Sequence, residues 1–294
     1  METSQFMVQL DVKITLFLKE KINPLTLSRL KSILVFFGIG IFLFFSVFII
    51  KAEAADLDRD LQVTVPILLY HNISNDDSAS NRYVVDVSDF KKQMEQLRKW
   101  GYSSITIKDL IDHISYGKPL PARPVVISFD DGYIEVFTTA FPIMEKLGFR
   151  GTVYIVANRL SADGFLTIEE LQELIDQDWE VGSHGMTHTE LTQNHNLVRN
   201  EILQSRLDLE NALGVKIYSF AYPFGALDWY VSNKVYDYGY QAAVGVGTLS
   251  NHSIGTIYNL SRREVQGDYS LETFSGLLPW TNYAPEPVRK YKPE

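Results

Sequence analysis

The stretch Val125–Tyr133, which reads VVISFDDGY, begins as a run of apolar and β-branched residues and ends in two adjacent carboxylates and a glycine. The run predicts a buried strand. A carboxylate is costly to bury unless it is paired or bound to a metal, so Asp130 and Asp131 mark a candidate site at the end of that strand. Successive side chains of a strand point to opposite faces, and we therefore expect different roles for the two, one as a metal ligand and the other as a base. The alternative is an ordinary Asp-Gly turn.

Strand-like and helix-like segments alternate on both sides of this stretch. Further strands are expected at residues 63–70, near 105, at 152–156, near 181, and at 217–222, 241–244 and 262–265. Helices are expected to start at Ser88 or Asp89 and to cover 109–115, 133–147, 166–175, 198–213 and 228–238. Thr167 is expected to cap the helix at 166–175. The alternation predicts an α/β protein with a mostly parallel sheet that closes into a barrel. In such a fold, functional groups gather in the loops at the carboxyl ends of the strands.

The composition excludes several classes of protein and site. The chain has 294 residues, 46% of them hydrophobic, a net charge of -9 and no cysteine. The absence of cysteine excludes disulfides, thiolate metal sites and a cysteine nucleophile. A nucleic-acid surface would need a basic patch, and the acidic balance of this chain gives no sign of one.

The N-terminal part of the sequence predicts passage through a membrane. Residues 33–50 form an apolar run that only two glycines and a serine interrupt, about long enough to span a bilayer core. Lysines and an arginine precede this run, which places residues 1–32 in the cytoplasm and everything after the run outside the cytoplasm. We interpret 33–50 as an uncleaved transmembrane anchor, 51–62 as a linker and 63–294 as the folded domain. The competing interpretation is a signal peptide cleaved near Ala54, which would give a secreted protein.

Two histidines four residues apart, His184 and His188, follow another strand-like segment. In one helical turn they would share a face and could grip one metal; otherwise they are unrelated loop histidines. They are expected at the same end of the sheet as Asp131, and a carboxylate with two imidazoles is a common zinc-ligand set with an open position for water. His71 ends a further strand and is a third histidine candidate for this rim. The histidines interpreted as surface or structural residues are His113, His195 and His252.

Three blocks of sequence together resemble the motifs of the NodB-type polysaccharide deacetylases. They are SFDDG at 128–132, EVGSHGMTH at 180–188 and FAYPFG at 220–225, and the opening LYHNI at 69–73 strengthens the match. The resemblance runs from about Val63 to the last strand, so 63–294 would be a polysaccharide deacetylase catalytic domain. It implies a distorted parallel (β/α) barrel, a divalent metal, usually zinc, and hydrolysis of N-acetyl groups on a sugar polymer.

The resemblance also implies a role for each motif residue. The implied metal ligands are Asp131, His184 and His188. Asp130 would be the general base, taking a proton from a water that the metal activates. The backbone N–H of Phe224 would hold the developing oxyanion, and Tyr222 of the same motif is assigned with it to the oxyanion and substrate site.

The reaction also needs a general acid that protonates the departing amine, and the motifs above do not supply one. Most of the family uses a histidine motif near the C-terminus, and no convincing counterpart follows residue 225; His252 lies in a polar loop sequence that fits poorly. Some members resemble a circularly permuted form in which a histidine on the first strand fills this role. His71 suits that form and is assigned as the acid.

The sequence departs from the family pattern at two places. The third motif often carries an arginine that orients the base, and Phe220–Tyr222 has none. Arg262 or Arg263 on the last strand could substitute, although a solvated surface pair is the favoured interpretation. Asp228 and Trp229 resemble a later family motif but follow the third motif too closely, so they are interpreted as a helix cap and a packing tryptophan.

The leading functional hypothesis is a metal-dependent deacetylase that acts on an N-acetylglucosamine-containing polysaccharide outside the cytoplasm. One alternative is an acetyl-ester deacetylase on another polysaccharide. A second is a catalytically silent carbohydrate-binding relative, although Asp130 and all three implied ligands are present. The sequence does not identify the glycan.

Overall fold

The computed structural model describes residues 41, 62–75 and 81–281. The predicted segments 1–32, 33–50 and 51–62 therefore lie outside the described residues, apart from Ile41 and Gln62. Within the part that is described, no helix combines the length and the apolar character needed to cross a bilayer.

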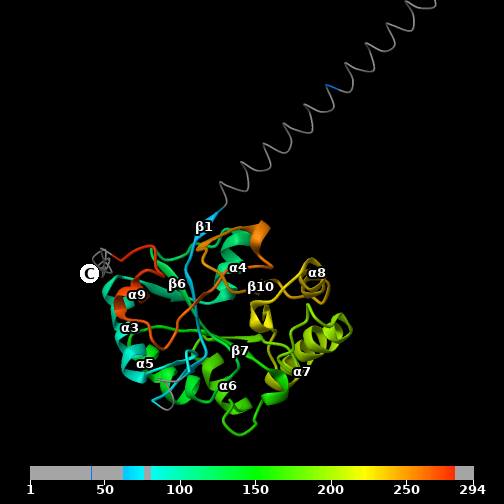
Figure 1. Cartoon of the computed structure of the whole chain (residues 1–294), viewed down its shortest axis with the longest axis horizontal. Coiled ribbons are helices and arrows are strands. Elements are labelled where there is room, and N and C mark those ends of the chain that lie inside the picture. Colours follow the sequence, from blue (N-terminus) through cyan, green and yellow to red (C-terminus); the bar gives the residue numbers. More distant parts are fainter. Residues whose placement is uncertain (1–40, 42–61, 76–80, 282–294) are drawn as a thin grey trace, which may run out of the picture. The chain divides into compact units, whose positions relative to one another are not determined.

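A curled parallel sheet forms the centre of the domain (Figure 1). Among the described residues it has eight strands: β2 (Ile67–Tyr70), β5 (Ser103–Ile105), β6 (Pro124–Phe129), β7 (Thr152–Ile155), β8 (Glu180–Ser183), β9 (Ser219–Ala221), β10 (Ala242–Val244) and β12 (Arg263–Glu264). The strands follow the order β10-β9-β8-β7-β6-β2-β12, and β5 pairs with the first half of β6. The central position of β6 confirms the sequence prediction that VVISF is a buried strand.

The two ends of this strand order are joined through the chain segment that precedes β12. The amide of Gly245 donates to the carbonyl of Leu260 at 2.9 Å, and the amide of Gly247 donates to the carbonyl of Arg262 at 2.8 Å. The next residues form β12, which pairs in parallel with β2. This segment therefore runs beside the chain that follows β10 and leads into β12, so the parallel sheet is strongly curled.

Short accessory strands lie outside the main sheet. In one antiparallel pair, β1 (Val63–Thr64) meets β11 (Asn251–His252), and in one parallel pair, β3 (Asn72–Ile73) meets β4 (Val84–Val85). Pro66 separates β1 from β2, so the expected single strand at 63–70 is two strands. The break is physical, because proline has no N–H to donate to a neighbouring strand.

Helices surround the sheet (Figure 1). The α-helices are α3 (Val87–Lys99), α4 (Ile107–Tyr116), α5 (Phe141–Lys146), α6 (Ile168–Asp176), α7 (Ser205–Leu213), α8 (Trp229–Asp237) and α9 (Leu271–Ser275). Wider π-helical turns at Val136–Ala140 and Arg199–Gln204 lead into α5 and α7, and 3₁₀ turns cover Ala157–Arg159, His195–Leu197, Pro223–Gly225 and Ile254–Thr256.

The helix starts test the capping predictions directly. Thr167 caps α6 with a reciprocal capping box, and the Asp228 side chain accepts from the amide of Val231 at the start of α8. The expected start of α3 at Ser88 or Asp89 is wrong, because Asp86 is the cap and accepts from the amide of Ser88 at 2.7 Å. All three caps satisfy amides that the first helical turn leaves without partners.

The two faces of β6 pack into different parts of the core. Val125, Ile127 and Phe129 belong to the larger cluster, together with helix residues, whereas Val126 packs with a smaller cluster formed mainly by other strands and α4. Because strand side chains alternate, Ser128 and then Asp130 continue the face of Val126. The strand therefore directs the Asp130 carboxylate into the inner side of the curled sheet.

Candidate active site

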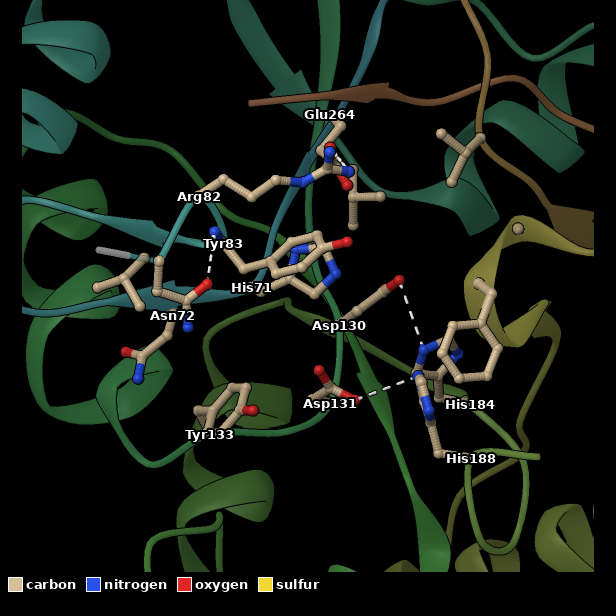
Figure 2. Close-up of a pocket in the computed structure, with 16 residues that line it drawn as sticks. His71, Asn72, Arg82, Tyr83, Asp130, Asp131, Tyr133, His184, His188 and Glu264 are labelled. Carbon is tan, nitrogen blue, oxygen red and sulfur yellow. Dashed lines mark hydrogen bonds and ion pairs between the residues drawn. The ribbon is translucent and has the colours of Figure 1, made fainter. Parts of the chain in front are cut away.

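A pocket of about 360 Å³ opens at the carboxyl ends of the central strands (Figure 2). Its lining includes the residues that the sequence analysis assigned to chemistry: His71 after β2, Asp130 and Asp131 after β6, His184 and His188 after β8, and Phe224 after β9. The volume falls within the range of small-molecule sites. Parallel strands thus bring together residues that lie more than 150 positions apart in the sequence.

Asp130 is buried and held by an arginine. Arg262 Nη1 lies 2.6 Å from Asp130 Oδ1, and Nη2 lies 2.7 Å from Oδ2, which makes a bidentate pair. Burial alone would raise the pKa of Asp130, but the attraction of the Arg262 and His184 side chains outweighs it and lowers the pKa to about 2. Asp130 is therefore ionised at neutral pH, the state that a proton acceptor needs.

Arg262 itself is completely buried, so the expectation of a solvated surface pair is wrong for this residue. Its Nε donates to the carbonyl of Gly245, and its guanidinium lies 5.3 Å from the centre of the Tyr154 ring. Arg263 points elsewhere, toward the carbonyls of Thr248 and Gly276. Of the two arginines that the sequence offered as a substitute, Arg262 is the one that pairs with Asp130.

Asp131 lies beyond the end of β6, so a local turn of the backbone, and not the alternation of the strand, directs its carboxylate toward His188. Its backbone adopts a left-handed conformation with φ of 72°, and Gly132 follows with φ of 77°. Its Oδ1 accepts from Arg159 Nη1 at 3.2 Å and lies 3.6 Å from His188 Nε2. Two consecutive left-handed residues turn the chain sharply at the end of β6, which separates the two neighbouring carboxylates.

The segment that carries His184 and His188 is a loop, and the expected helical turn is wrong. Gly185 has φ of 83° and His188 has φ of 62°, conformations that a right-handed helix does not contain. A side chain at Gly185 would meet the carboxylate of Glu201 at 2.9 Å. The two rings nevertheless approach each other, with centres 4.8 Å apart, so the loop brings the imidazoles together by another route.

Asp131, His184 and His188 fit a divalent metal. One potential ligand atom from each lies within 4.8 Å of the others. His184 Nδ1–H donates to the carbonyl of Ala221 at 2.8 Å, which leaves its Nε2 lone pair directed toward the carboxylates. A backbone acceptor of this kind fixes the tautomer of a metal-ligating histidine. One carboxylate and two imidazoles suit zinc and several other divalent ions, and no metal identity follows from them.

His71 reaches the same pocket from the first strand of the sheet. Its ring lies under Tyr83, with ring centres 4.8 Å apart, and its Nδ1 is buried without a hydrogen-bond partner among the described residues. Burial lowers the pKa of His71, while the Asp130 and Asp131 carboxylates act in the opposite direction. Figure 2 shows His71, the residue that the sequence assigns as the general acid, beside Asp130 in the pocket.

The third motif contributes Phe224 but not the side chain of Tyr222. Phe224 lines the pocket, is 66% exposed, has φ of 61° and packs its ring 4.5 Å from that of His188. Tyr222 is fully buried in the larger core, and its hydroxyl donates to the carbonyl of Tyr258. The expectation that Tyr222 contacts substrate is therefore corrected, because its side chain points into the core.

The remaining histidines lie outside the pocket, as predicted. His252 is buried on β11 and donates to the carbonyl of Val65, whereas His195 pairs with Asp228 and His113 contacts the carbonyl of Lys118. Trp229 departs from expectation: it is 81% exposed, so it is not a packing tryptophan.

Comparison with known proteins gives the same family as the motifs. The sequence profile of the family described as "Polysaccharide deacetylase" matches residues 117–243. YxkH of Bacillus subtilis strain 168, which is assigned to the polysaccharide deacetylases, is 26% identical over 215 residues, 73% of this chain and 76% of its own length. Residues 117–243 of this chain belong to the polysaccharide deacetylase family.

Two further members of the family show how far the similarity extends. The structure of a polysaccharide deacetylase from Bacillus cereus superposes with a TM-score of 0.65 at 25% identity and covers 74% of this chain and 69% of its own. The poly-β-1,6-N-acetyl-D-glucosamine N-deacetylase of Escherichia coli strain K12 is 30% identical over 111 residues, which are 37% of this chain. That match spans only 16% of the E. coli protein.

Arg159 is a charged residue of this site that the sequence patterns do not indicate. It stands in no recognised motif, and only the position of β7 between β6 and β8 brings it to Asp131. The order of strands in the sheet could have indicated that the end of β7 contributes to the site, but not which residue does so.

Proposed function

We propose that this chain is a metal-dependent hydrolase that removes N-acetyl groups from an N-acetylglucosamine-containing polysaccharide. The observation that carries the proposal is the separation of two adjacent carboxylates. Asp131 joins His184 and His188 in a possible ligand set, while Asp130 is held ionised by Arg262 with its Oδ2 3.6 Å from His184 Nε2. A metal site beside a fixed carboxylate is the arrangement that hydrolysis by an activated water requires.

Each residue of the site has a separate role in this proposed reaction. A bound metal would lower the pKa of a water and polarise the acetamide carbonyl. Asp130 accepts the proton of the attacking water, since it is ionised and fixed in direction by Arg262. The backbone N–H of Phe224 stabilises the negative charge that develops on the carbonyl oxygen. His71 donates a proton to the departing amine, which leaves acetate and a free amino group on the sugar.

The polymer class is supported by the relatives. The E. coli protein named above is a poly-β-1,6-N-acetyl-D-glucosamine N-deacetylase, and proteins of the same name from two Staphylococcus species also match parts of this chain. The pocket is open to solvent and bordered by exposed Tyr83 and Phe224, flat faces of a kind that can pack on sugar rings. An amide substrate is therefore preferred over the acetyl ester.

The proposal includes export of the catalytic domain, 63–294. Its support is the apolar run at 33–50 and the basic residues before it. We propose an uncleaved anchor with the domain outside the cytoplasm, where a polymer of the cell wall or matrix is accessible. A cleaved signal that ends near Ala54 is the alternative.

The decisive experiment measures acetate release by the purified full chain from N-acetylglucosamine oligomers, before and after treatment with a chelator. We expect release that the chelator abolishes and that added zinc restores. An O-acetylated oligomer tested in parallel distinguishes amide from ester hydrolysis. No release from either substrate, with one equivalent of metal bound, would identify a silent binding protein and contradict the proposal.

A further inference from the structure

The metal-ligand set draws on two strands that are not neighbours. Asp131 follows β6 and His184 follows β8, and β7 (Thr152–Ile155) lies between them in the sheet. The 3₁₀ turn Ala157–Arg159, which follows β7, carries Arg159. Its Nη1 donates to Asp131 Oδ1 at 3.2 Å, so an arginine occupies the gap between the two ligand-bearing loops.

The turn that carries Arg159 is bonded to the histidine loop, and the segment that follows the turn is bonded to the loop after β6. The amide of Ala157 donates to the carbonyl of Gly185 at 2.9 Å, and the amide of Asn158 donates to the carbonyl of Met186 at 3.1 Å, both between the two histidines. On the other side, the amide of Leu166 donates to the carbonyl of Gly132 at 2.9 Å. These bonds hold the backbone near Arg159 in register with the loops on either side.

The guanidinium is also placed by an aromatic ring. It lies 5.3 Å from the centre of the Phe165 ring, and Phe165 stacks on Tyr133, a pocket residue two positions after Asp131. A cation over a ring face is attracted by the negative potential of that face. Arg159 is 33% exposed at its side chain, yet it has a defined position.

The two adjacent carboxylates therefore each have an arginine, in different geometries. Arg262 binds both oxygens of Asp130 at 2.6 and 2.7 Å, whereas Arg159 makes one longer contact with a single oxygen of Asp131. That oxygen, Oδ1, is the one 3.6 Å from His188 Nε2. The contact leaves Asp131 lone pairs free, as a metal ligand needs, while it limits rotation of the carboxylate.

We infer that Arg159 is a positioning residue of the metal site, which holds the Asp131 carboxylate in the orientation that binds the divalent cation. The inference rests on the proposed function. Metal-ligating carboxylates are themselves commonly hydrogen-bonded, and loss of such a partner typically costs about 10–100-fold in metal affinity. The positive charge of Arg159 acts against this effect by repelling the cation, but its partial exposure allows solvent and salt to screen the charge. Removal of Arg159 should therefore weaken metal binding through the loss of orientation and strengthen it through the loss of repulsion.

The test compares zinc affinities of the metal-stripped full chain by competition with a chromogenic chelator. We expect Arg159→Met to bind zinc about 10–100-fold more weakly than wild type, and Arg159→Lys to recover part of the loss. Arg206→Met is the matched control, since the Arg206 guanidinium also lies over an aromatic ring and donates a hydrogen bond, but to the backbone carbonyl of Gly239 and away from the pocket. It should bind zinc like the wild type.

A second measurement separates positioning from other roles. At saturating zinc, Arg159→Met should regain the kcat and KM of the wild type, because only metal affinity is impaired. Zinc affinity that is unchanged or tighter in Arg159→Met, or a kinetic defect that persists at saturating zinc, would overturn the inference while the proposed function stands. Failure of the wild-type chain to bind zinc or any divalent ion would overturn both. If Arg159→Met does not fold, Arg159→Gln, which keeps a donor, is compared with Arg159→Leu in the same assay.

Discussion

Arg262 binds both carboxylate oxygens of Asp130 from a fully buried position on the far side of β2 from β6. Ser128 lies two residues before Asp130, and its Oγ is 3.4 Å from Arg262 Nη1. The Asp130 carboxylate therefore cannot rotate freely, and its direction is determined by the residue that immediately precedes β12.

Replacing Arg262 with methionine should destabilise the fold by about 3–5 kcal/mol, because it leaves a buried carboxylate without its partner. Urea unfolding of the metal-free chain measures this loss. The double variant Arg262→Met with Asp130→Asn should be less destabilised than the single Arg262→Met, since the uncompensated charge is gone. Equal destabilisation of the two would contradict the pairing, and Arg263→Met provides a control with a smaller expected effect.

Asp130→Asn should lower kcat by about 10²–10⁴-fold, the usual size of a general-base contribution, and still bind one equivalent of metal. Asparagine keeps the shape of the side chain but cannot accept the proton of the attacking water. Acetate release and metal analysis of the same preparation check both statements. Turnover at the wild-type rate would remove Asp130 from the role of base.

His184→Ala should lose both metal and activity, with zinc affinity reduced by more than about 100-fold, since loss of a ligand should cost more than loss of an outer hydrogen bond. The carbonyl of Ala221 also loses its donor in this variant. His195→Ala removes a histidine that pairs with Asp228 outside the pocket and should keep the wild-type zinc affinity. A His184→Ala protein that retains metal would show that the ligand set is wrong.

His71→Ala should give a folded, metal-loaded protein whose kcat is about 10²–10⁴-fold lower, because the departing amine lacks its proton donor. His113→Ala, at an exposed position away from the pocket, is the control. If the His71 variant turns over normally, the acid lies elsewhere, and His252 is a poor replacement because it is buried against Val65.

The stability of the domain should depend on pH through Glu180. This carboxyl accepts from the amide of Lys108 and the hydroxyl of Ser219, both at 2.7 Å, and burial raises its pKa from 4.5 to about 7. The folded state therefore retains a proton that the unfolded state loses between pH 4.5 and 7, so stability falls as pH rises through this window. The loss should reach up to about 3 kcal/mol, at about 1.4 kcal/mol per pH unit.

Urea unfolding of metal-free wild type and Glu180→Gln at pH 4.5, 6 and 7.5 checks this prediction. Glutamine cannot ionise, so the difference in unfolding free energy between the two proteins should change with pH in the stated direction. A difference that stays constant from pH 4.5 to 7.5 would mean that Glu180 keeps an ordinary pKa.

The parts of the site that local sequence determines were predictable. The apolar run of β6 identified the strand, and the rule that parallel strands end at one edge brought Asp130, Asp131, His184 and His71 together. The caps Thr167 and Asp228 followed from side chains that can accept from free amides. The family resemblance supplied the division of roles between the carboxylates.

What depends on strand order and on fine backbone geometry was not predictable. Arg262 carries the same signal in sequence as its neighbour Arg263, and only the closure of the sheet buries one of them against Asp130. The loop from His184 to His188 was interpreted as a helical turn because the spacing of four fits one, but the left-handed Gly185 breaks it. Tyr222 was assigned to substrate because the motif does not show which way its ring points.

The left-handed backbone at Asp131, His188 and Phe224 has a consequence for evolution and engineering of this chain. Each such residue costs of order 1 kcal/mol or more relative to a relaxed conformation, and a bulky residue such as Phe224 is among the less tolerant. Glycine would relieve the cost at every one of these positions, and at Asp131 and His188 it would delete a proposed metal ligand. The pocket thus embodies a trade-off between stability and activity, in which the most stable sequence for this backbone is an inactive one.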